Sequence, residues 1–318
     1  MKLGYWLAVI LLAEAPAVAQ KWSPPKTPDG QPDLQGVWTN GTATPLERPA
    51  ALAGKEFFTE QEAAAYEKEL RARTDADRRD GPVEADVGRA YNDFWWDRGK
   101  KVVGSRRTSL IVDPEDGRIP PLTPEGKNRA GARAEARRRH PADGPEDRPL
   151  GDRCIVWQNE GPPMIPSVYN NNYRIVQTPG YVVIQIEMIH DARVIPLDGR
   201  PHLPQNVRQW LGDSRGHWEG NTLVVDTTNF TDKTNFRGSG AGLHVEERFS
   251  RVDPETILYE FKVEDPANWT SSWSAQIPMS RTSDLIFEYA CHEGNYAMAG
   301  ILGAARAEEN AAAAKGSR

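Results

Sequence analysis

The chain has 318 residues and a formal net charge of −6 at pH 7. Nucleic-acid binding depends on clustered Lys and Arg that neutralise phosphates, so this acidic balance argues against a nucleic-acid partner. The length allows one large domain or two small ones. A transmembrane helix needs about 20 apolar residues, and no part of the sequence contains such a run.

The first 19 residues have the pattern of a secretory signal peptide. Lys2 precedes an apolar run over residues 3–12, and Ala17-Val18-Ala19 forms a cleavage site before Gln20. No Cys follows the apolar run, which argues against a lipoprotein anchor. We therefore predict cleavage near Ala19 and Gln20 and a periplasmic or extracellular protein. The alternative is a cytosolic protein with an apolar start.

Residues 20–150 are expected to be irregular and partly helical, because Pro and Gly punctuate them as in loops and turns. Thr59 and Glu62 form a capping box that predicts a helix over residues 59–73. A second, Arg-rich helix is predicted over residues 124–139, and one strand over residues 108–112. We expect this segment to pack on a separate core.

From Asn172 onward, short apolar and alternating segments predict strands joined by tight turns. Pro179-Gly180 predicts a hairpin in which Thr178 pairs with Tyr181, and Ile175 with Ile184. Further strands are expected over residues 222–228, 243–252, 256–264, 273–278 and 284–289, with Val252 opposite Thr256. These strands predict a mainly β fold, an antiparallel β-barrel or sandwich that is calycin-like if it is a barrel.

The predicted domain organisation is a β-rich core over residues 151–305, followed by a tail over residues 306–318. The tail is Ala-rich and polar, which predicts a frayed helix or a disordered end. The two cysteines, Cys154 and Cys291, are expected to form a disulfide after export. The alternative is a free nucleophilic cysteine.

The densest group of candidate catalytic residues is the segment 187–193, at the end of a strongly apolar strand. Glu187 can serve as a general base or a metal ligand, and His190 as its acid–base partner, oriented by Asp191. Arg193 can hold an anionic substrate or an oxyanion. The alternative is a turn closed by Asp191, with a surface ion pair between Glu187 and Arg193.

A second candidate is the segment 291–296, which the disulfide would hold near Cys154. Here His292 and Glu293 are candidate acids, although His292 can also simply solvate a loop end. If the two segments converge, their His and Glu side chains can form a mixed nitrogen and oxygen site for a divalent metal. The spacing matches no recognised ligand signature, so the metal status stays open.

Candidate substrate-binding residues lie on the polar face of the first hairpin and beside a Ser- and Thr-rich turn. The alternative for the tryptophans is that they fill the core. His202, His217 and His244 are scattered, and we assign them to turns and surface. The candidates are Asn172, Arg174, Gln185, Arg193, Trp269 and Trp273.

Four motifs together resemble a large family of proteins secreted by soil bacteria, a family to which no activity is assigned. The resemblance covers nearly all of the mature chain and therefore implies secretion without implying a reaction. The Gly36-x-Trp38 start also resembles the first strand of lipocalin-type barrels, although the helical segment that follows departs from them. The motifs are Pro32–Trp38, Gln177–Gly180 with Glu187–Asp191, Gly212–Gly220 and Cys291–Asn295.

We predict an enzyme that uses general acid–base chemistry, metal-assisted or not, on a small polar or carbohydrate-derived substrate. A lyase, an isomerase or a hydrolase fits this prediction. The alternative is a non-catalytic barrel that binds an apolar or aromatic ligand, and a third reading is an envelope protein without a pocket. The polarity of a pocket separates the first two, and the lack of one favours the third.

Overall fold

The computed structural model of the protein describes residues 22–79, 81, 92–96, 98–157, 159–234 and 236–316, so the predicted signal peptide lies outside the described residues. The α-helices are α1 (Glu60–Thr74), α3 (Pro124–Arg139) and α4 (Tyr296–Gly316). The strands are β1 (Gly36–Thr39), β2 (Ile111–Asp113), β3 (Asn172–Thr178), β4 (Tyr181–Ile186), β5 (Ala192–Pro196), β6 (Asp213–Glu219), β7 (Thr222–Thr228), β8 (His244–Asp253), β9 (Thr256–Glu264) and β10 (Trp273–Arg281).

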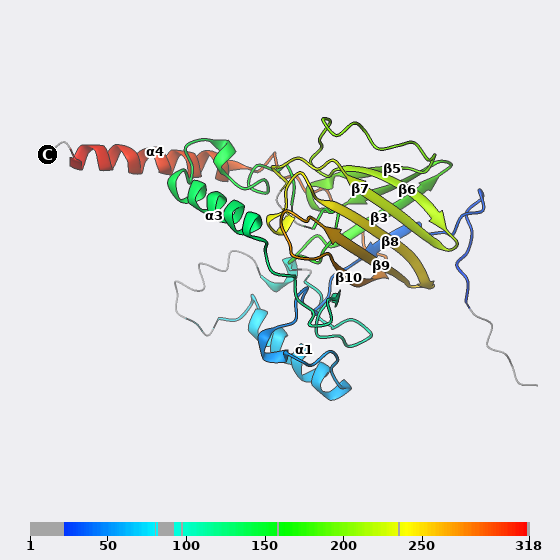
Figure 1. Cartoon of the computed structure of the whole chain (residues 1–318). Helices are drawn as coiled ribbons and strands as arrows, with labels where there is room; N and C mark the ends of the chain where they lie inside the picture. Colours follow the sequence, from blue (N-terminus) through cyan, green and yellow to red (C-terminus); the bar gives the residue numbers. More distant parts are fainter. Residues whose placement is uncertain are drawn as a thin grey trace, which may run out of the picture.

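All of these strands except β2 form a nearly closed antiparallel barrel (Figure 1), which confirms the predicted fold class. The order around the barrel is β5-β4-β3-β1-β10-β9-β8-β7-β6, and β2 pairs with β10 beside this path. β1 comes from the N-terminal segment that was expected only to pack on the core, so this segment also supplies a strand of the barrel.

The barrel closes at a seam between β5 and β6, the two ends of the strand order. Because neighbouring strands alternate in direction, β5 and β6 run the same way, and residues 197–212 return along the barrel to join them. A Cβ atom on Gly216 would lie 2.9 Å from Cγ2 of Ile195 and 2.7 Å from Cδ2 of Leu197. Glycine at this position therefore lets the two strands approach each other.

The predicted strand registers are confirmed over all of the β3–β4 hairpin and over most of the β8–β9 hairpin. Thr178 pairs with Tyr181, and Ile175 with Ile184. In the β8–β9 hairpin, Phe249 lies opposite Tyr259 as predicted. The predicted pairing of Val252 with Thr256 is wrong, because an irregularity between residues 251 and 253 puts Asp253 opposite Thr256.

Large side chains fill the inside of the barrel, because one face of every strand points inward. Strands β8 and β9 show the alternation clearly, with every second residue buried over most of their length. Aromatic side chains contact one another along the inner wall, such as Phe249 and Tyr259 on neighbouring strands, with ring centroids 4.9 Å apart. The largest fully buried aromatic side chains are Trp38, Trp273, Tyr173, Tyr259, Phe230, Phe249 and Phe261.

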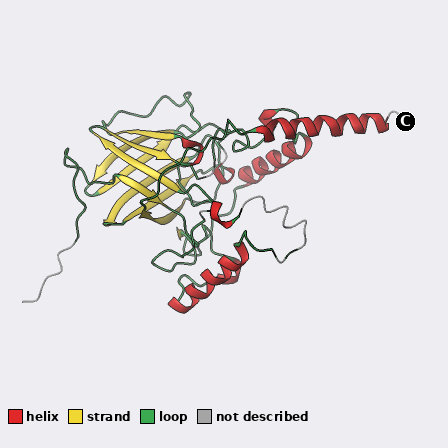
Figure 2. Cartoon of the chain, turned by 180° about the vertical axis from the view of Figure 1, so that it is seen from behind, coloured by secondary structure: helices red, strands yellow, loops and turns green. Residues whose placement is uncertain are grey.

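The helices gather at one end of the barrel, which we call the helical end (Figure 2). At this end β4, β7 and β9 finish, and β3, β8 and β10 begin. Both predicted helices form: Thr59 and Glu62 cap α1 reciprocally, and Thr123 caps α3 ahead of a proline. In the described residues, no helix combines the length and apolar composition needed to cross a bilayer.

Two local predictions differ from the structure. Residues 284–289 form no strand, and the strand expected over residues 108–112 is reduced to Ile111–Asp113. The C-terminal stretch, expected to be a frayed helix or a disordered end, is helical as far as Gly316, within α4. Arg306 on this helix donates hydrogen bonds to the backbone carbonyls of Ala142 and Asp143, which ties α4 to the loop after α3.

The predicted disulfide between Cys154 and Cys291 is present, with 5.7 Å between its Cα atoms. It joins the loop before β3 to the segment that leads into α4. Asn295 strengthens this junction by donating a hydrogen bond to the backbone carbonyl of Asp152, at 2.9 Å. The disulfide therefore fixes two polar segments, 137 residues apart in sequence, at the helical end.

Candidate functional site

Three adjoining cavities run around the helical end and along the seam. The first, of about 570 Å³, lies between α1 and the barrel, and it shares Ile165 and Arg237 with the second, of about 710 Å³. The third, of about 540 Å³, lies at the seam and shares Leu211 with the second. Volumes of about 300–1,000 Å³ are typical of small-molecule sites.

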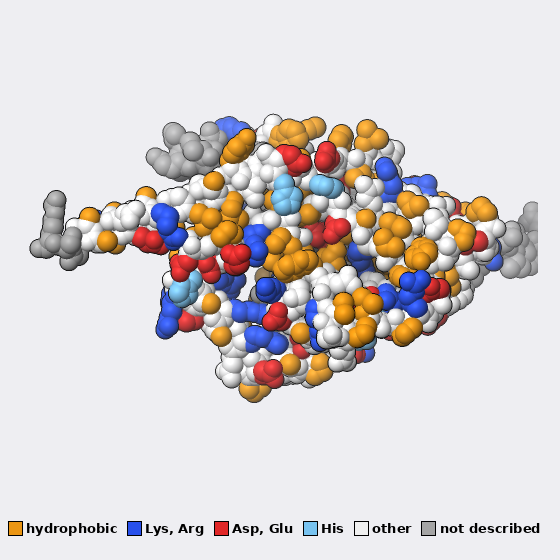
Figure 3. Space-filling view, turned by 90° about the horizontal axis from the view of Figure 1, so that it is seen from above, with side chains coloured by type: hydrophobic (Ala, Val, Ile, Leu, Met, Phe, Trp, Pro, Cys, Tyr) orange, Lys and Arg blue, Asp and Glu red, His pale blue; other side chains and the backbone are white. Residues whose placement is uncertain are grey.

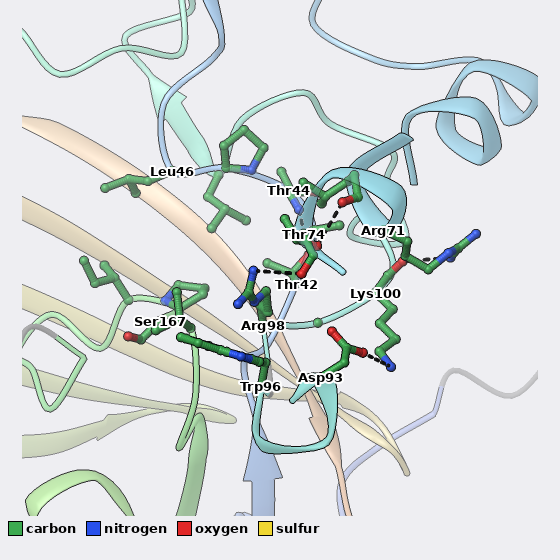
Figure 4. A pocket seen from close by; sticks show the side chains of 18 of the residues that line it. Thr42, Thr44, Leu46, Arg71, Thr74, Asp93, Trp96, Arg98, Lys100 and Ser167 are labelled. Atoms are coloured by element: carbon green, nitrogen blue, oxygen red, sulfur yellow. Dashed lines mark hydrogen bonds and ion pairs between the residues drawn. The ribbon is translucent and has the colours of Figure 1, made fainter. Parts of the chain in front are cut away.

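The charged groups of the first cavity are mostly occupied by neighbouring groups (Figure 4). The guanidinium of Arg98 lies 4.2 Å from the centre of the Trp96 ring, and it donates to the carbonyl of Thr74 at 3.5 Å. Lys100 pairs with Asp93 at 3.5 Å. These contacts join α1 to residues 92–101, so we assign the first cavity mainly to packing.

The second cavity is richer in cations than in anions. It is lined by Arg137, Arg148, Arg153, Lys233 and Arg237, but only by two carboxylates, Glu146 and Asp147. Figure 3 shows Lys and Arg side chains gathered around a hollow where the projecting helix α4 meets the rest of the molecule. Trp157, Phe230 and Phe236 give this cavity an aromatic lining.

Glu187, predicted as a base or a metal ligand, holds two segments together at the helical end. It is only 4% exposed, and its carboxylate accepts hydrogen bonds from Nδ2 of Asn172 at 2.8 Å and from the backbone N–H of Phe287 at 3.2 Å. Glu187 thus joins the start of β3 to the segment before Cys291, and neither of these contacts reaches residues 291–296. Asn172, predicted to bind substrate, instead orients Glu187.

His190 is exposed and has one ring nitrogen available for chemistry. Its Nδ1 lies 3.0 Å from the carbonyl oxygen of Tyr289. A carbonyl only accepts hydrogen bonds, so Nδ1 carries the proton and Nε2 has a free lone pair in the neutral ring. The carbonyl of Tyr289 orients His190, rather than Asp191 as predicted.

The backbone of this turn adopts a conformation that side chains rarely tolerate. Ile189 and His190 both have positive φ, 60° and 49°, and Ile189 is β-branched. Such residues are uncommon outside glycine and cost of order 1–3 kcal/mol each, and they cluster at functional sites. Asp191 closes the turn by accepting a hydrogen bond from the N–H of Ala192.

The most perturbed carboxyl group at the helical end is Glu160, which sequence reasoning missed. Its side chain is fully buried, and its Oε1 accepts a hydrogen bond from the N–H of Trp157 at 3.0 Å. Its Oε2 has no hydrogen-bond partner among the described residues. Burial raises the pKa of Glu160 from 4.5 to about 8, and the negative charge of Asp191 adds to this shift. The only signal in the sequence was a polar Asn-Glu pair before Gly-Pro-Pro.

Arg193, predicted as a substrate clamp, points into the barrel. Its Nη1 lies 3.0 Å from Oε1 of Glu247, and the same carboxylate accepts a hydrogen bond from the hydroxyl of Tyr259 at 2.9 Å. Arg193 and Ser214 line the third cavity. The alternative surface pair of Arg193 with Glu187 is therefore wrong, because Glu247 holds the guanidinium inside the barrel.

The other predicted site residues are not brought together. Trp269 and Trp273 are 2% and 0% exposed and pack edge-to-face, so they belong to the core and are not ligand platforms. Arg174 and Gln185 pair across β3 and β4 on the outer face of the barrel. His292 and Glu293 are exposed in the turn after the disulfide. No group of three or more His, Cys, Asp and Glu side chains is arranged to hold a metal ion within the described residues.

A chain of charged side chains joins the segment 197–212 to the outer face of β6, β7 and β8. The two ring nitrogens of His202 lie 3.0 Å from Asp213 and 2.7 Å from Asp226. The other oxygen of Asp226 lies 2.5 Å from Nε2 of His244. This contact lowers the pKa of Asp226 and raises that of His244. The two histidines, assigned from sequence to turns and surface, thus meet at one carboxylate.

We expect Asp226→Asn to lower the pKa of His244 toward its ordinary value of 6.5. A raised histidine pKa adds stability at low pH that is lost as pH rises through the folded-state value, so the variant should lose more stability at mildly acidic than at alkaline pH. Ring C–H signals followed by NMR against pH give the pKa. An unchanged His244 titration would contradict the contact. The signal of His217, which pairs with Glu219, is the internal reference.

Comparisons with models of known protein families, with curated proteins and with solved structures give no match. The resemblance to proteins secreted by soil bacteria remains a prediction from the motifs.

Proposed function

We propose that the protein is an acid–base enzyme of the hydrolase or lyase type, acting at the helical end on a small carbohydrate-derived molecule. The observation that carries the proposal is the buried carboxyl of Glu160, one oxygen of which has no hydrogen-bond partner in the part of the chain that the structure describes. Trp157 and Gly161, on either side of it in sequence, line the second cavity, and Asp191, which raises its pKa, lines the third. A perturbed carboxyl beside a cavity is typical of a catalytic acid.

Glu160 supplies the acid in this proposal, and His190 supplies the base. With a pKa of about 8, Glu160 keeps its proton at neutral pH and can give it to a leaving oxygen as the bond to carbon breaks. Nε2 of His190 takes a proton from the attacking water in hydrolysis, or from the substrate carbon in elimination. Each turnover thus moves one proton from Glu160 and one to His190, and solvent restores both.

The filled barrel argues against the rival function, a barrel that encloses an apolar ligand. Tyr173, Tyr259 and Trp273 occupy the interior and are fully buried. The cavities lie at the helical end and along the seam, and charged groups line all three. The disulfide favours an oxidising compartment, so we retain the proposal of a periplasmic or extracellular protein.

The test is turnover by the mature chain on aryl glycosides and aryl uronides, with unsaturated products of elimination from polyuronates followed by ultraviolet absorbance. We expect Glu160→Gln to lower kcat by about 10²–10⁴-fold with an unchanged circular dichroism spectrum. Glu308→Gln, on the exposed face of α4, is the matched control and should keep full activity. The wild-type rate should fall above a pH of about 8 as Glu160 ionises. Full activity in Glu160→Gln, or no turnover of any of these substrates, would refute the proposal.

A further inference from the structure

The second cavity concentrates cations that have no protein partner. Among the described residues, the side chains of Arg137, Arg153, Lys233 and Arg237 make no ion pair and no hydrogen bond, whereas Arg148 pairs with Asp152 at 2.8 Å. Other cations nearby are also occupied, such as Arg138, which pairs with Glu135 on the outside of α3. A concave group of cations without carboxylate partners creates a positive potential that attracts an anion.

The aromatic wall of this cavity is held in place by the backbone. A Cβ atom on Gly151 would lie 2.2 Å from Cε3 of Trp157, so only glycine at this position leaves room for the indole ring. Nε1 of Trp157 has no hydrogen-bond partner among the described residues. This nitrogen is buried, so what Trp157 offers to the cavity is its ring, and an aromatic ring suits a sugar, which stacks through its C–H face.

Two further features connect these cations to the proposed acid. The N–H of Trp157 donates to Glu160, so the aromatic wall and the acid belong to one turn. Arg237 lines both the first and second cavities from a backbone with φ of 50°, which is uncommon for a residue with a side chain. A ring bound against Trp157 would thus lie beside the cations of the cavity and next to the turn that carries Glu160.

We propose that the second cavity binds an acidic sugar, with its carboxylate on Arg153 and Arg237 and its ring against Trp157. The claim that an acidic sugar is the substrate rests on the proposed function. The claim that the cavity binds an acidic sugar rests on the cavity alone. Guanidinium groups are suited to carboxylates because they donate paired, charge-assisted hydrogen bonds. Sulfated sugars share this anionic chemistry and are distinguished in the test.

The test is calorimetric titration of the mature chain with trigalacturonate, with neutral galactotriose and with a sulfated galactose oligomer, each at low and high salt. We expect trigalacturonate to bind most tightly and more weakly at high salt. The double variant Arg153→Ala/Arg237→Ala should weaken its binding by about tenfold or more. The matched control Arg138→Ala/Arg139→Ala removes the same charge from the outer side of α3, where both side chains pair with Glu135, and should change affinity by less than about twofold.

Equal losses in the two double variants, equal binding of the neutral sugar, or no binding of trigalacturonate would overturn the inference. Tighter binding of the sulfated oligomer would overturn the assignment to a carboxylate. The variant Glu160→Gln separates this inference from the proposed function, because it keeps the cations and should bind trigalacturonate with unchanged affinity. If trigalacturonate binding depends on Arg153 and Arg237 but Glu160→Gln keeps full turnover, the role of Glu160 as the acid would be refuted and the binding site would stand. If Glu160→Gln loses turnover of a neutral substrate and the wild type does not bind trigalacturonate, the acidic-sugar assignment would be refuted and the role of Glu160 as the acid would stand.

Discussion

Glu247→Leu is expected to lower the free energy of unfolding by roughly 3–5 kcal/mol, because it leaves Arg193 charged inside the barrel without a partner. The two side chains are 0% and 3% exposed, and they lie on strands β8 and β5, which are not neighbours in the sheet. Burial alone would disfavour the charge of Arg193, but Glu247 more than offsets this, so the pKa of Arg193 is raised. Urea denaturation of the mature chain with its disulfide intact measures the loss.

The neighbouring residue provides the control. Glu246 precedes Glu247 on β8 but faces outward, where it pairs with Arg248 at 3.4 Å. Glu246→Leu should cost less than about 1 kcal/mol, since exposed ion pairs contribute little. The double variant Arg193→Met/Glu247→Leu should recover much of the loss, because it leaves no buried charge. Equal losses for Glu246→Leu and Glu247→Leu would show that the buried pair does not form.

The sequence allowed the faces and registers of the strands to be predicted, but it did not reveal which residues meet inside the barrel. Alternation along β8 and β9 specifies the pairing of Phe249 with Tyr259, because a slip by one residue would bury the polar face. Alternation also puts Glu247 on the inner face. Its partner Arg193 is 54 residues away, and only closure of the barrel brings the two together. The sequence therefore predicted Arg193 to bind substrate at the end of a strand, whereas the structure places its guanidinium on Glu247 inside the barrel.

The candidate site was predictable where a covalent bond or a strand end fixed it. The disulfide alone indicated that the segment after Cys291 lies near Cys154, and the end of β4 placed Glu187 and His190 at a loop. Glu160 could not be found this way. Its character comes from burial and from Asp191, which is 31 positions along the chain, and neither leaves a local pattern. Groups whose chemistry depends on burial are visible only once the packing is known.

Glu160→Gln is expected to make stability depend less on pH, by roughly 5 kcal/mol between acidic and alkaline solution. The pKa of Glu160 is about 8 in the folded chain and 4.5 as its ordinary value. Below a pH of about 4.5 the carboxyl is protonated in both the folded and the unfolded chain, so folding buries no negative charge at this position. Between the two values the unfolded chain releases the proton while the folded chain keeps it, so the wild type loses stability as pH rises. Above about 8 the loss is complete.

Urea midpoints of the wild type and of Glu160→Gln, measured at a series of pH values from about 4 to about 9, test this expectation. The two curves should lie close together at the acidic end and separate progressively toward the alkaline end, with the variant more stable there. Glu308→Gln, exposed on α4, controls for the loss of one carboxyl and should follow the wild type throughout. Parallel curves for the wild type and Glu160→Gln would mean that the carboxyl titrates alike in both states. In that case Glu160 would be ionised at neutral pH, and it could not be the acid of the proposed reaction.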